Sequence, residues 1–224
     1  KRLFLFWKKY LLKKKKMQLL DKNRLNLAKV DRTFFPYFHV ENALSHHFNS
    51  LDLADDFPNI ESGGSFPSDN LEEGNIKNLV EELEGDEFKA ILENKFEVDL
   101  KNAEVITTLR GFSRSKDGKI HTDSQSKILT VLLYLNKNWD NKIGNLRLLK
   151  ENNNLDNFIQ EISSEYGNLV AFKVTDNCWH GFMPFEGKRL SIQLNYIYPE
   201  SLNTHKIRHK LSALFKKFIA GSSN

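Results

Sequence analysis

The sequence predicts a mainly β protein with helices before the β region and one helix after it. After residue 103, short apolar or alternating runs follow one another, separated by segments rich in Asn, Asp, Gly and Lys. Runs of this kind, bounded by turn-forming residues, are typical of antiparallel strands in a sandwich or jelly roll. On either side of this region, apolar residues recur at helical spacing instead.

The composition is that of a soluble globular protein and excludes several other classes. The chain has 224 residues, of which 40% are hydrophobic and 28% are charged, which suits one domain with a sizeable core. The net charge is only +4, so no nucleic-acid partner is expected. No run of about 18 apolar residues occurs, so no membrane span is expected. Cys178 is the single cysteine, which rules out a disulfide within the chain and favours a reducing, cytoplasmic location.

The first 16 residues are set apart by their charge. Residues 1–16 are basic, their apolar run is broken by lysines, and no small-residue cleavage site follows, so they make a poor signal peptide. Our hypothesis is that Met17 is the natural start and that this extension is not native. The expected organisation is then a single domain over 17–224, with a β core over about 100–198 and a closing helix over about 205–220.

The predicted elements before the β core are few. Residues 34–44 predict a short strand that leads into a turn, and residues 43–54 predict a short helix. Residues 55–72 are rich in Asp, Ser, Gly and Pro and predict a loop. Apolar residues at helical spacing over 76–96 predict two helices, interrupted at Gly85-Asp86.

The β core is expected to contain six strands, followed by the closing helix. An apolar stripe along 205–220 predicts that helix and is interpreted as core packing. The predicted strands are 104–112, 119–123, 127–136, 144–149, 168–174 and 188–198.

Two of these strands carry polar side chains at alternating positions. Along 189–197, one face carries apolar residues and the other carries Arg189, Ser191, Gln193 and Asn195. Because alternate residues of a strand point to opposite faces, these four line either solvent or a polar cavity. Residues 128–134 are apolar on both faces except for Thr130 and Tyr134, which share one face and need hydrogen-bond partners if they are buried. A polar cavity shared with Arg189 would supply those partners.

His121 and Asp123 are the first candidate metal ligands. Side chains two residues apart on a strand point the same way, although a lone His-x-Asp pair has little value by itself. His180, after the strand at 168–174, can meet them at the mouth of a jelly roll, and two histidines with one carboxylate form the facial triad of non-haem Fe(II) enzymes. A structural zinc site would need four ligands, usually with Cys. Cys178 would point the same way as His180, so a Cys ligand stays open, although the preferred interpretation of Cys178 is packing. Trp179 and Phe182 are interpreted as packing around His180.

Arg189 is the candidate anion-binding residue. It follows His180 by nine residues, a spacing that allows a turn and a return on a neighbouring strand. A guanidinium is suited to a bidentate grip on a carboxylate, and Ser191 points the same way with a second donor.

These motifs together resemble a known family. HTD (121–123), WHGF (179–182) and GKRLSIQL (187–194) look like the 2-oxoglutarate- and Fe(II)-dependent oxygenases, in particular the prolyl-4-hydroxylase-like branch. ILTVLLYLNKNWD (128–140) and GNLRLL (144–149) are also similar to that branch. The likeness covers about residues 34–198 and implies a double-stranded β-helix, or jelly roll, as the core.

The resemblance also implies an activity and roles for individual residues. It implies a dioxygenase, an oxidoreductase that hydroxylates or otherwise oxidises a C–H bond of its substrate and releases succinate and CO₂. Its cofactors would be Fe(II), 2-oxoglutarate and O₂, with ascorbate as a candidate reductant. The implied iron ligands are His121, Asp123 and His180. The implied 2-oxoglutarate-binding residues are Arg189, Tyr134, Thr130 and Ser191.

Two departures from the family pattern bear on the primary substrate. The aromatic lining expected before the His-x-Asp pair is replaced by RGFSRSKDGK (110–119), and an aromatic late in the final strand is replaced by Asn195. The substrate is therefore open and can be a small molecule or a protein residue. The loops 55–72, 110–119 and 150–166 are expected to frame its entry.

Two other functions stay open from the sequence. One is a non-catalytic jelly-roll binding module that keeps the fold. The other is a metal-dependent hydrolase that uses the same triad, which would need a general base near a metal-bound water.

Overall fold

The core of the protein is a six-stranded antiparallel sheet with its longest strand near the centre. In the computed structural model, which describes residues 18–45 and 50–201, the strand order is β1-β7-β4-β9-β3-β2. The large sheet consists of β1 (Tyr37–Val40), β2 (Phe66–Pro67), β3 (Glu104–Ser113), β4 (Lys127–Tyr134), β7 (Leu169–Lys173) and β9 (Gly187–Ile197). A second sheet has the order β6-β5-β8 and consists of β5 (Leu146–Leu149), β6 (Phe158–Ile162) and β8 (His180–Gly181).

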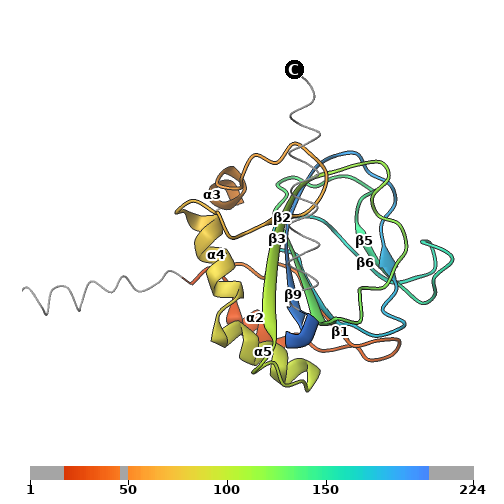
Figure 1. Ribbon diagram of the computed structural model, residues 1–224. Helices are drawn as coiled ribbons and strands as arrows, with labels where there is room; N and C mark the ends of the chain where they lie inside the picture. The colour runs from red at the N-terminus through yellow and green to blue at the C-terminus, as the bar shows by residue number, and fades with distance from the viewer. Residues whose placement is uncertain (1–17, 46–49, 202–224) are drawn as a thin grey trace, which may run out of the picture.

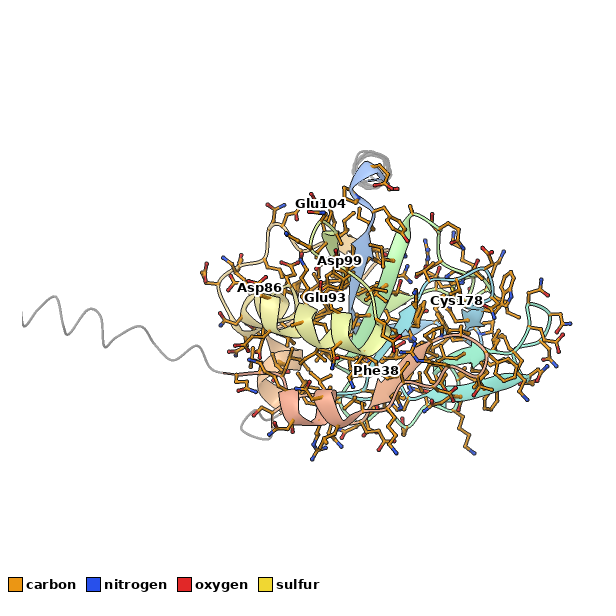
Figure 2. The ribbon with its side chains drawn as sticks, turned by 90° about the horizontal axis from the view of Figure 1, so that it is seen from below. Phe38, Asp86, Glu93, Asp99, Glu104 and Cys178 are labelled. Carbon is orange, nitrogen blue, oxygen red and sulfur yellow. The ribbon has the colours of Figure 1, made fainter. Side chains whose placement is uncertain are left out.

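The helices lie on one face of the large sheet, and the small sheet lies on the other (Figure 1). The helices are α2 (Lys22–Leu27), α3 (Ser50–Asp55), α4 (Asn75–Leu83) and α5 (Asp86–Phe96), and a 3-10 turn follows β9 at Pro199–Ser201. Figure 2 shows α5, with Asp86 and Glu93, on one side of the strands and Cys178 on the other. This two-sided β architecture confirms the predicted fold class, a β core of the jelly-roll type with flanking helices.

Strand alternation separates two apolar cores. On β9, residues 190, 192, 194 and 196 are buried against the helices. On β1, Phe38 belongs to this helix-side core, whereas its neighbour Tyr37 belongs to the core between the two sheets. Because successive side chains of a strand point to opposite faces, each central strand contributes to both layers. The face of the large sheet that points away from the helices is therefore available to form a site.

The two predicted helices over 76–96 are confirmed, including the break at Gly85-Asp86. The buried residues of α4 are Ile76, Leu79, Val80 and Leu83, spaced so that one stripe faces the sheet. The Asp56 carboxylate accepts a hydrogen bond from the Ile76 N–H (2.8 Å) and so satisfies one of the free donors at the start of α4. Asp86 in the first turn of α5 suits the positive end of that helix.

The predicted helix over 43–54 is wrong at its start. Leu44 forms an isolated bridge with Leu20 instead, and the helix α3 runs over Ser50–Asp55. The loop over 55–72 is confirmed apart from the two-residue β2. The short helix α2 was not predicted, because its six residues are too few to show a helical period.

The predicted strand over 119–123 is wrong. His121 makes only an isolated bridge to His180 there. The reason is that turns lie on both sides: Gly118 adopts a φ of 90°, and the Lys127 N–H bonds to the Ser124 carbonyl (2.9 Å). The segment between these turns has room for one pair of backbone hydrogen bonds and no ladder.

The other five core strands are confirmed to within two residues at each end. Strands β6 and β8 were missed, since β8 has two residues and β6 has no clear alternation. The extension over 1–16 and the closing helix over 205–220 lie outside the described residues. Within the part of the chain that the structure describes, no helix is long and apolar enough to cross a membrane.

Candidate functional site

A cavity of about 800 Å³ opens between the two sheets, on the side of the large sheet that faces away from the helices. Its floor is formed by the polar positions of the central strands, including Arg189, Ser191, Gln193 and Asn195 of β9. The expected polar cavity on this face of β9 is thus present. Thr130 and Tyr134 of β4 line the same cavity, as their alternation on that strand requires.

Two of the three loops expected to frame the entry line this cavity. Gly63–Ser65 come from the loop 55–72, and several residues of 110–119 form another part of the wall. The expectation for 150–166 is wrong. Its β6 pairs with β5 in the small sheet, and a separate cavity of about 580 Å³ around His39 is lined by five residues of this segment, Gln160, Glu161, Ser163, Glu165 and Tyr166.

Three side chains that could hold a metal ion meet at one end of the cavity. His121, Asp123 and His180 each offer a ligand atom, and these atoms lie within 4.8 Å of one another. Two backbone hydrogen bonds hold the histidines together, from the His121 N–H to the His180 carbonyl and back, both 3.0 Å. The ring centroids of the two histidines are 4.3 Å apart. Residues 59 positions apart in the sequence are therefore brought together by a single antiparallel bridge.

Hydrogen bonds to backbone carbonyls fix which nitrogen of each histidine carries the proton. His121 Nδ1 lies 2.8 Å from the Lys119 carbonyl, and His180 Nδ1 lies 2.8 Å from the Cys178 carbonyl. A carbonyl only accepts hydrogen bonds, so each Nδ1 is the protonated nitrogen. The lone pair of each neutral ring is then on Nε2, which is the usual arrangement of histidines that bind metals.

Asp123 is held by two neighbours. The Lys127 ammonium lies 2.9 Å from Asp123 Oδ1, and the Thr130 hydroxyl donates to Oδ2. Burial raises the pKa of Asp123, but the charges of Lys127 and His180 and the hydrogen bond from Thr130 outweigh it, so the net pKa is below the usual value. The carboxylate is therefore ionised at neutral pH.

His180 is buried, with 6% of its surface exposed. Burial is the main cause that lowers its pKa to about 4, although the Asp123 charge acts in the opposite direction. The ring is accordingly neutral at pH 7. An ionised carboxylate and a neutral imidazole are the protonation states in which these groups bind metal ions.

The donor set fits Fe(II) better than structural zinc. Two imidazole nitrogens and one carboxylate are the ligands of non-haem Fe(II) sites with open positions, whereas structural zinc takes four closed ligands, usually with thiolates. Cys178 is not part of the cluster. It is fully buried in the core between the sheets, as its interpretation as packing requires.

At the other end of the cavity, the Arg189 guanidinium is fixed by three acceptors. Its Nε donates to the Gly144 carbonyl (2.8 Å) and to the Ser164 hydroxyl (3.1 Å), and its Nη2 donates to the Tyr134 hydroxyl (3.3 Å). The ring of Phe182 lies 4.3 Å from the guanidinium carbon. Arg189 is buried, with 6% exposed, so its charge is presented to the cavity in one orientation.

The register of β4 and β9 decides which polar residues lie near Arg189. Tyr134 is opposite Ser191, whereas Thr130 is opposite Asn195. Four residues along a strand span about 13 Å, so Thr130 lies at the metal end, where its hydroxyl bonds to Asp123 and lies 3.3 Å from Asn195 Oδ1. Tyr134 and Ser191 lie at the Arg189 end.

Several residues of the site were missed by the sequence reasoning. Lys127 pairs with Asp123, and Ser164 and the Gly144 carbonyl orient Arg189. The last two come from loops whose position no periodicity predicts. Arg110 could have been found, because it lies two residues after Thr108 on β3 and shares the cavity-facing side of that strand, as Arg189 shares such a side with Ser191 on β9.

Comparisons with known proteins agree with this geometry. Residues 110–197 match the model of the 2OG-Fe(II) oxygenase superfamily, a span that contains the three clustered residues and Arg189. No curated protein is significantly similar to the chain in sequence.

Solved structures share the fold at low sequence identity. A prolyl-4-hydroxylase from Pseudomonas putida is 16% identical, with a TM-score of 0.53, over 72% of this chain and 85% of that one. A prolyl 4-hydroxylase from Phytophthora capsici is 14% identical, with a TM-score of 0.51, over 72% of this chain and 58% of that one. Together with the family match, the shared fold confirms the resemblance inferred from the motifs.

Proposed function

We propose that this chain oxidises a C–H bond of a primary substrate at the cavity between its sheets. The match over residues 110–197 to the 2OG-Fe(II) oxygenases, which are oxidoreductases, supports this proposal. The observation that carries the proposal is the pairing of two sites in one cavity. A His-Asp-His cluster lies at one end, and a buried arginine lies at the other. A metal-binding module alone would have no use for the second site.

The metal end would hold Fe(II) through His121 Nε2, His180 Nε2 and the Asp123 carboxylate. Three protein ligands leave coordination positions open for 2-oxoglutarate and O₂, the co-substrates that the family implies. When bound, Fe(II) supplies the redox chemistry that converts 2-oxoglutarate and O₂ to succinate and CO₂ and oxidises the substrate. Thr130 would keep Asp123 in its ligating orientation through the hydroxyl bond to Oδ2.

The other end would bind the carboxylate of 2-oxoglutarate that is far from the metal. Arg189 Nε already donates to Gly144 and Ser164, so the terminal nitrogens would be the donors for that carboxylate. Tyr134 and Ser191, opposite each other on adjacent strands, would add hydroxyl donors. Because Arg189 is held before the co-substrate arrives, little ordering of the side chain opposes binding.

Apolar side chains would keep the reaction away from bulk water. Leu132, Leu146 and Phe182 line the cavity between its two polar ends. Such a lining lowers the local dielectric and strengthens the charged contacts at both ends.

The cavity lining, in the part of the chain that the structure describes, does not favour the hydrolase. Among the described residues that line the cavity, Asp117 is the one carboxylate besides Asp123. Both of its oxygens accept hydrogen bonds from the Arg114 guanidinium, and the Arg114 N–H donates to it as well (3.0 Å). Burial raises the pKa of Asp117, but the hydrogen bonds and the charge of Arg114 outweigh it, so the net pKa is below the usual value and Asp117 is a weak general base.

The test is to add Fe(II) and 2-oxoglutarate to the metal-free protein without oxygen, and then to admit oxygen. We expect a weak visible absorption band from the metal–co-substrate complex, followed by succinate release. Both should be lost in His121→Ala and Asp123→Ala and kept in His39→Asn, a histidine at the separate cavity.

The rival functions give other outcomes of the same test. A binding module gives neither the band nor succinate, and a hydrolase binds the metal but consumes no 2-oxoglutarate; either result would overturn the proposal. The use of ascorbate and the cytoplasmic location stay predictions, and a screen for compounds that stimulate succinate release identifies the primary substrate.

A further inference from the structure

A second guanidinium faces the cavity, and the proposed function gives it no role. Arg110 lies on β3, where it alternates with Ile106 and Thr108 along the face that lines the cavity. In the sheet register it is opposite Ser191 of β9. The charges that act on it include those of Arg189, Asp117 and Asp123, so Arg110 is within electrostatic reach of both ends of the site.

Arg110 differs from its basic neighbours because it has no acidic partner. Lys127 pairs with Asp123, and Arg114 pairs with Asp117. Arg110 donates from Nε to the Ser65 hydroxyl (3.0 Å), and no carboxylate of the described residues lies within ion-pair distance. Its two terminal nitrogens therefore keep their donors for a ligand.

Keeping the charge of Arg110 at this position costs free energy when no anion is bound. Burial is the main cause that lowers the pKa of Arg110, and the positive charge of Arg189 lowers it further; the charges of Asp117 and Asp123, which lie beyond ion-pair distance, act in the opposite direction but do not reverse the shift. An arginine nevertheless stays protonated in proteins, so the protein carries an unpaired, partly buried charge at this point. A bound anion would offset both the desolvation and the repulsion between the two guanidinium groups.

The balance of charge around the cavity also favours an anion. Among the described lining residues, six side chains are basic (Arg110, Arg114, Lys116, Lys119, Lys127 and Arg189), and two are acidic. Fe(II) and doubly charged 2-oxoglutarate cancel each other, so their binding leaves this excess in place. One carboxylate of 2-oxoglutarate is assigned to the metal and the other to Arg189, so neither is left for Arg110.

We propose that the primary substrate carries an anionic group, a carboxylate or a phosphate, and that the terminal nitrogens of Arg110 bind it. This inference rests on the proposed function, because it takes the Arg189 end to be occupied by 2-oxoglutarate. A guanidinium suits either anion through paired hydrogen bonds. Arg110 is then a specificity-determining residue, placed in the segment 110–119 where the family's aromatic lining is missing.

The test measures anion binding directly and needs no knowledge of the substrate. Protein loaded with Fe(II) and saturating 2-oxoglutarate without oxygen is titrated with acetate, methyl phosphate and neutral acetamide by calorimetry. We expect the anions to bind at least about tenfold more tightly than acetamide. Whichever anion binds more tightly identifies the group that the substrate carries.

Two variants separate a specific donor from the general positive field. Arg110→Gln and Lys116→Gln each remove one positive charge, but Lys116 is exposed at the rim of the cavity. We expect Arg110→Gln to weaken anion binding about tenfold or more and Lys116→Gln to weaken it less than about twofold. Arg110→Lys keeps the charge without the fork of donors, so its anion affinity should lie between those of the wild type and Arg110→Gln. If Arg110→Gln does not fold, Arg110→Lys takes its place in the test.

Three results would overturn the inference. They are no measurable binding of either anion at tens of millimolar, equal weakening in the two Gln variants, or a rise in the 2-oxoglutarate requirement of Arg110→Gln with unchanged anion binding. The last result would assign Arg110 to the co-substrate. Failure of the proposed function can be told apart from failure of this inference. In that case the wild-type protein would lack the visible band, and the anion titration does not measure that band.

Discussion

The two ends of the cavity are built in different ways. At the Arg189 end, the residues lie on β4 and β9, where a continuous ladder places Tyr134 opposite Ser191 and buries both at 1% exposure. At the metal end, His121 lies outside any strand and is exposed, and one isolated bridge connects it to His180. The backbone positions of the Arg189 end are therefore set by the sheet, and Gly144 and Ser164 of two loops orient the guanidinium, whereas the metal end is held by a few hydrogen bonds.

This difference shows how the fold divides two tasks. A central sheet of long strands is among the most stable parts of a protein, so side chains on it hold their positions without a ligand. Segments between turns open more easily, and there a bound ion contributes to holding its ligands in place. We expect substitutions at the metal end to affect metal binding and local stability together, and substitutions at the Arg189 end to affect co-substrate binding alone.

The largest effect is expected from Asp123→Asn, which tests the metal end. The amide keeps the size of the side chain but loses the charge, and loss of a ligand should cost more than the roughly 10–100-fold that supporting residues cost. We expect the affinity for Fe(II) to fall at least about 100-fold, measured by anaerobic titration. The control is Asp176→Asn, an exposed acid outside the cluster, which should bind the metal as the wild type does. Unchanged affinity in Asp123→Asn would remove this residue from the ligand set.

The next prediction concerns pH and uses His180 as a reporter of the metal end. Its folded pKa of about 4 is below the ordinary value of about 6.5, so the unfolded chain binds more protons between these values. The free energy of unfolding of the metal-free protein therefore contains the full contribution of His180 above pH 6.5. This contribution falls by up to about 3 kcal/mol as pH drops toward 4. Urea unfolding of the wild type and of His180→Gln at several pH values measures this. The same slope in both proteins would show that other groups cause it.

Arg189→Lys tests the end that the sheet fixes. The lysine keeps the charge but loses the fork of donors, so one or more charged hydrogen bonds of about 1.5–3 kcal/mol are lost. We expect the 2-oxoglutarate requirement to rise about 10–100-fold, measured by succinate release, while Fe(II) affinity stays the same. Arg32→Lys, at a partly exposed arginine that pairs with Glu97, is the control. A parallel loss of metal affinity in Arg189→Lys would break the division between the two ends.

Tyr134→Phe should give the smallest change. It removes one hydroxyl that accepts from Arg189 (3.3 Å) and leaves the packing of the ring in place. The expected cost is about 0.5–1.5 kcal/mol in co-substrate binding, which is about 2–10-fold in the 2-oxoglutarate requirement. A larger change with normal stability would give the hydroxyl a direct role in binding the carboxylate.

Long, regular elements were predictable and short ones were not. The break between α4 and α5 and the long strands β3, β4 and β9 could be read from periodicity, because packing against one core repeats at a fixed spacing. The two-residue β8 and the bridge at His121 have no such period. They form because strands distant in the sequence meet there, and that is a property of the whole fold.

The candidate residues were named from the sequence, whereas their grouping was decided by the tertiary structure. Motifs at 121–123, 179–182 and 187–194 were sufficient to select the two histidines, the aspartate and Arg189. The register of β4 and β9 then assigned Thr130 to the metal end and Tyr134 to the Arg189 end. No local pattern could make that distinction, because both residues are on the same face of one strand.

By itself, the sequence determined the chemical types present and the strands that carry them, because motifs and alternation are local properties of the chain. Only the tertiary structure decided which charges are already paired. It placed Lys127 against Asp123 and Arg114 against Asp117, and it left Arg110 facing the cavity without an acid. The physical reason is that ion pairs depend on distances of a few ångströms between side chains, and in this cavity those distances are set by where strands, turns and loops converge.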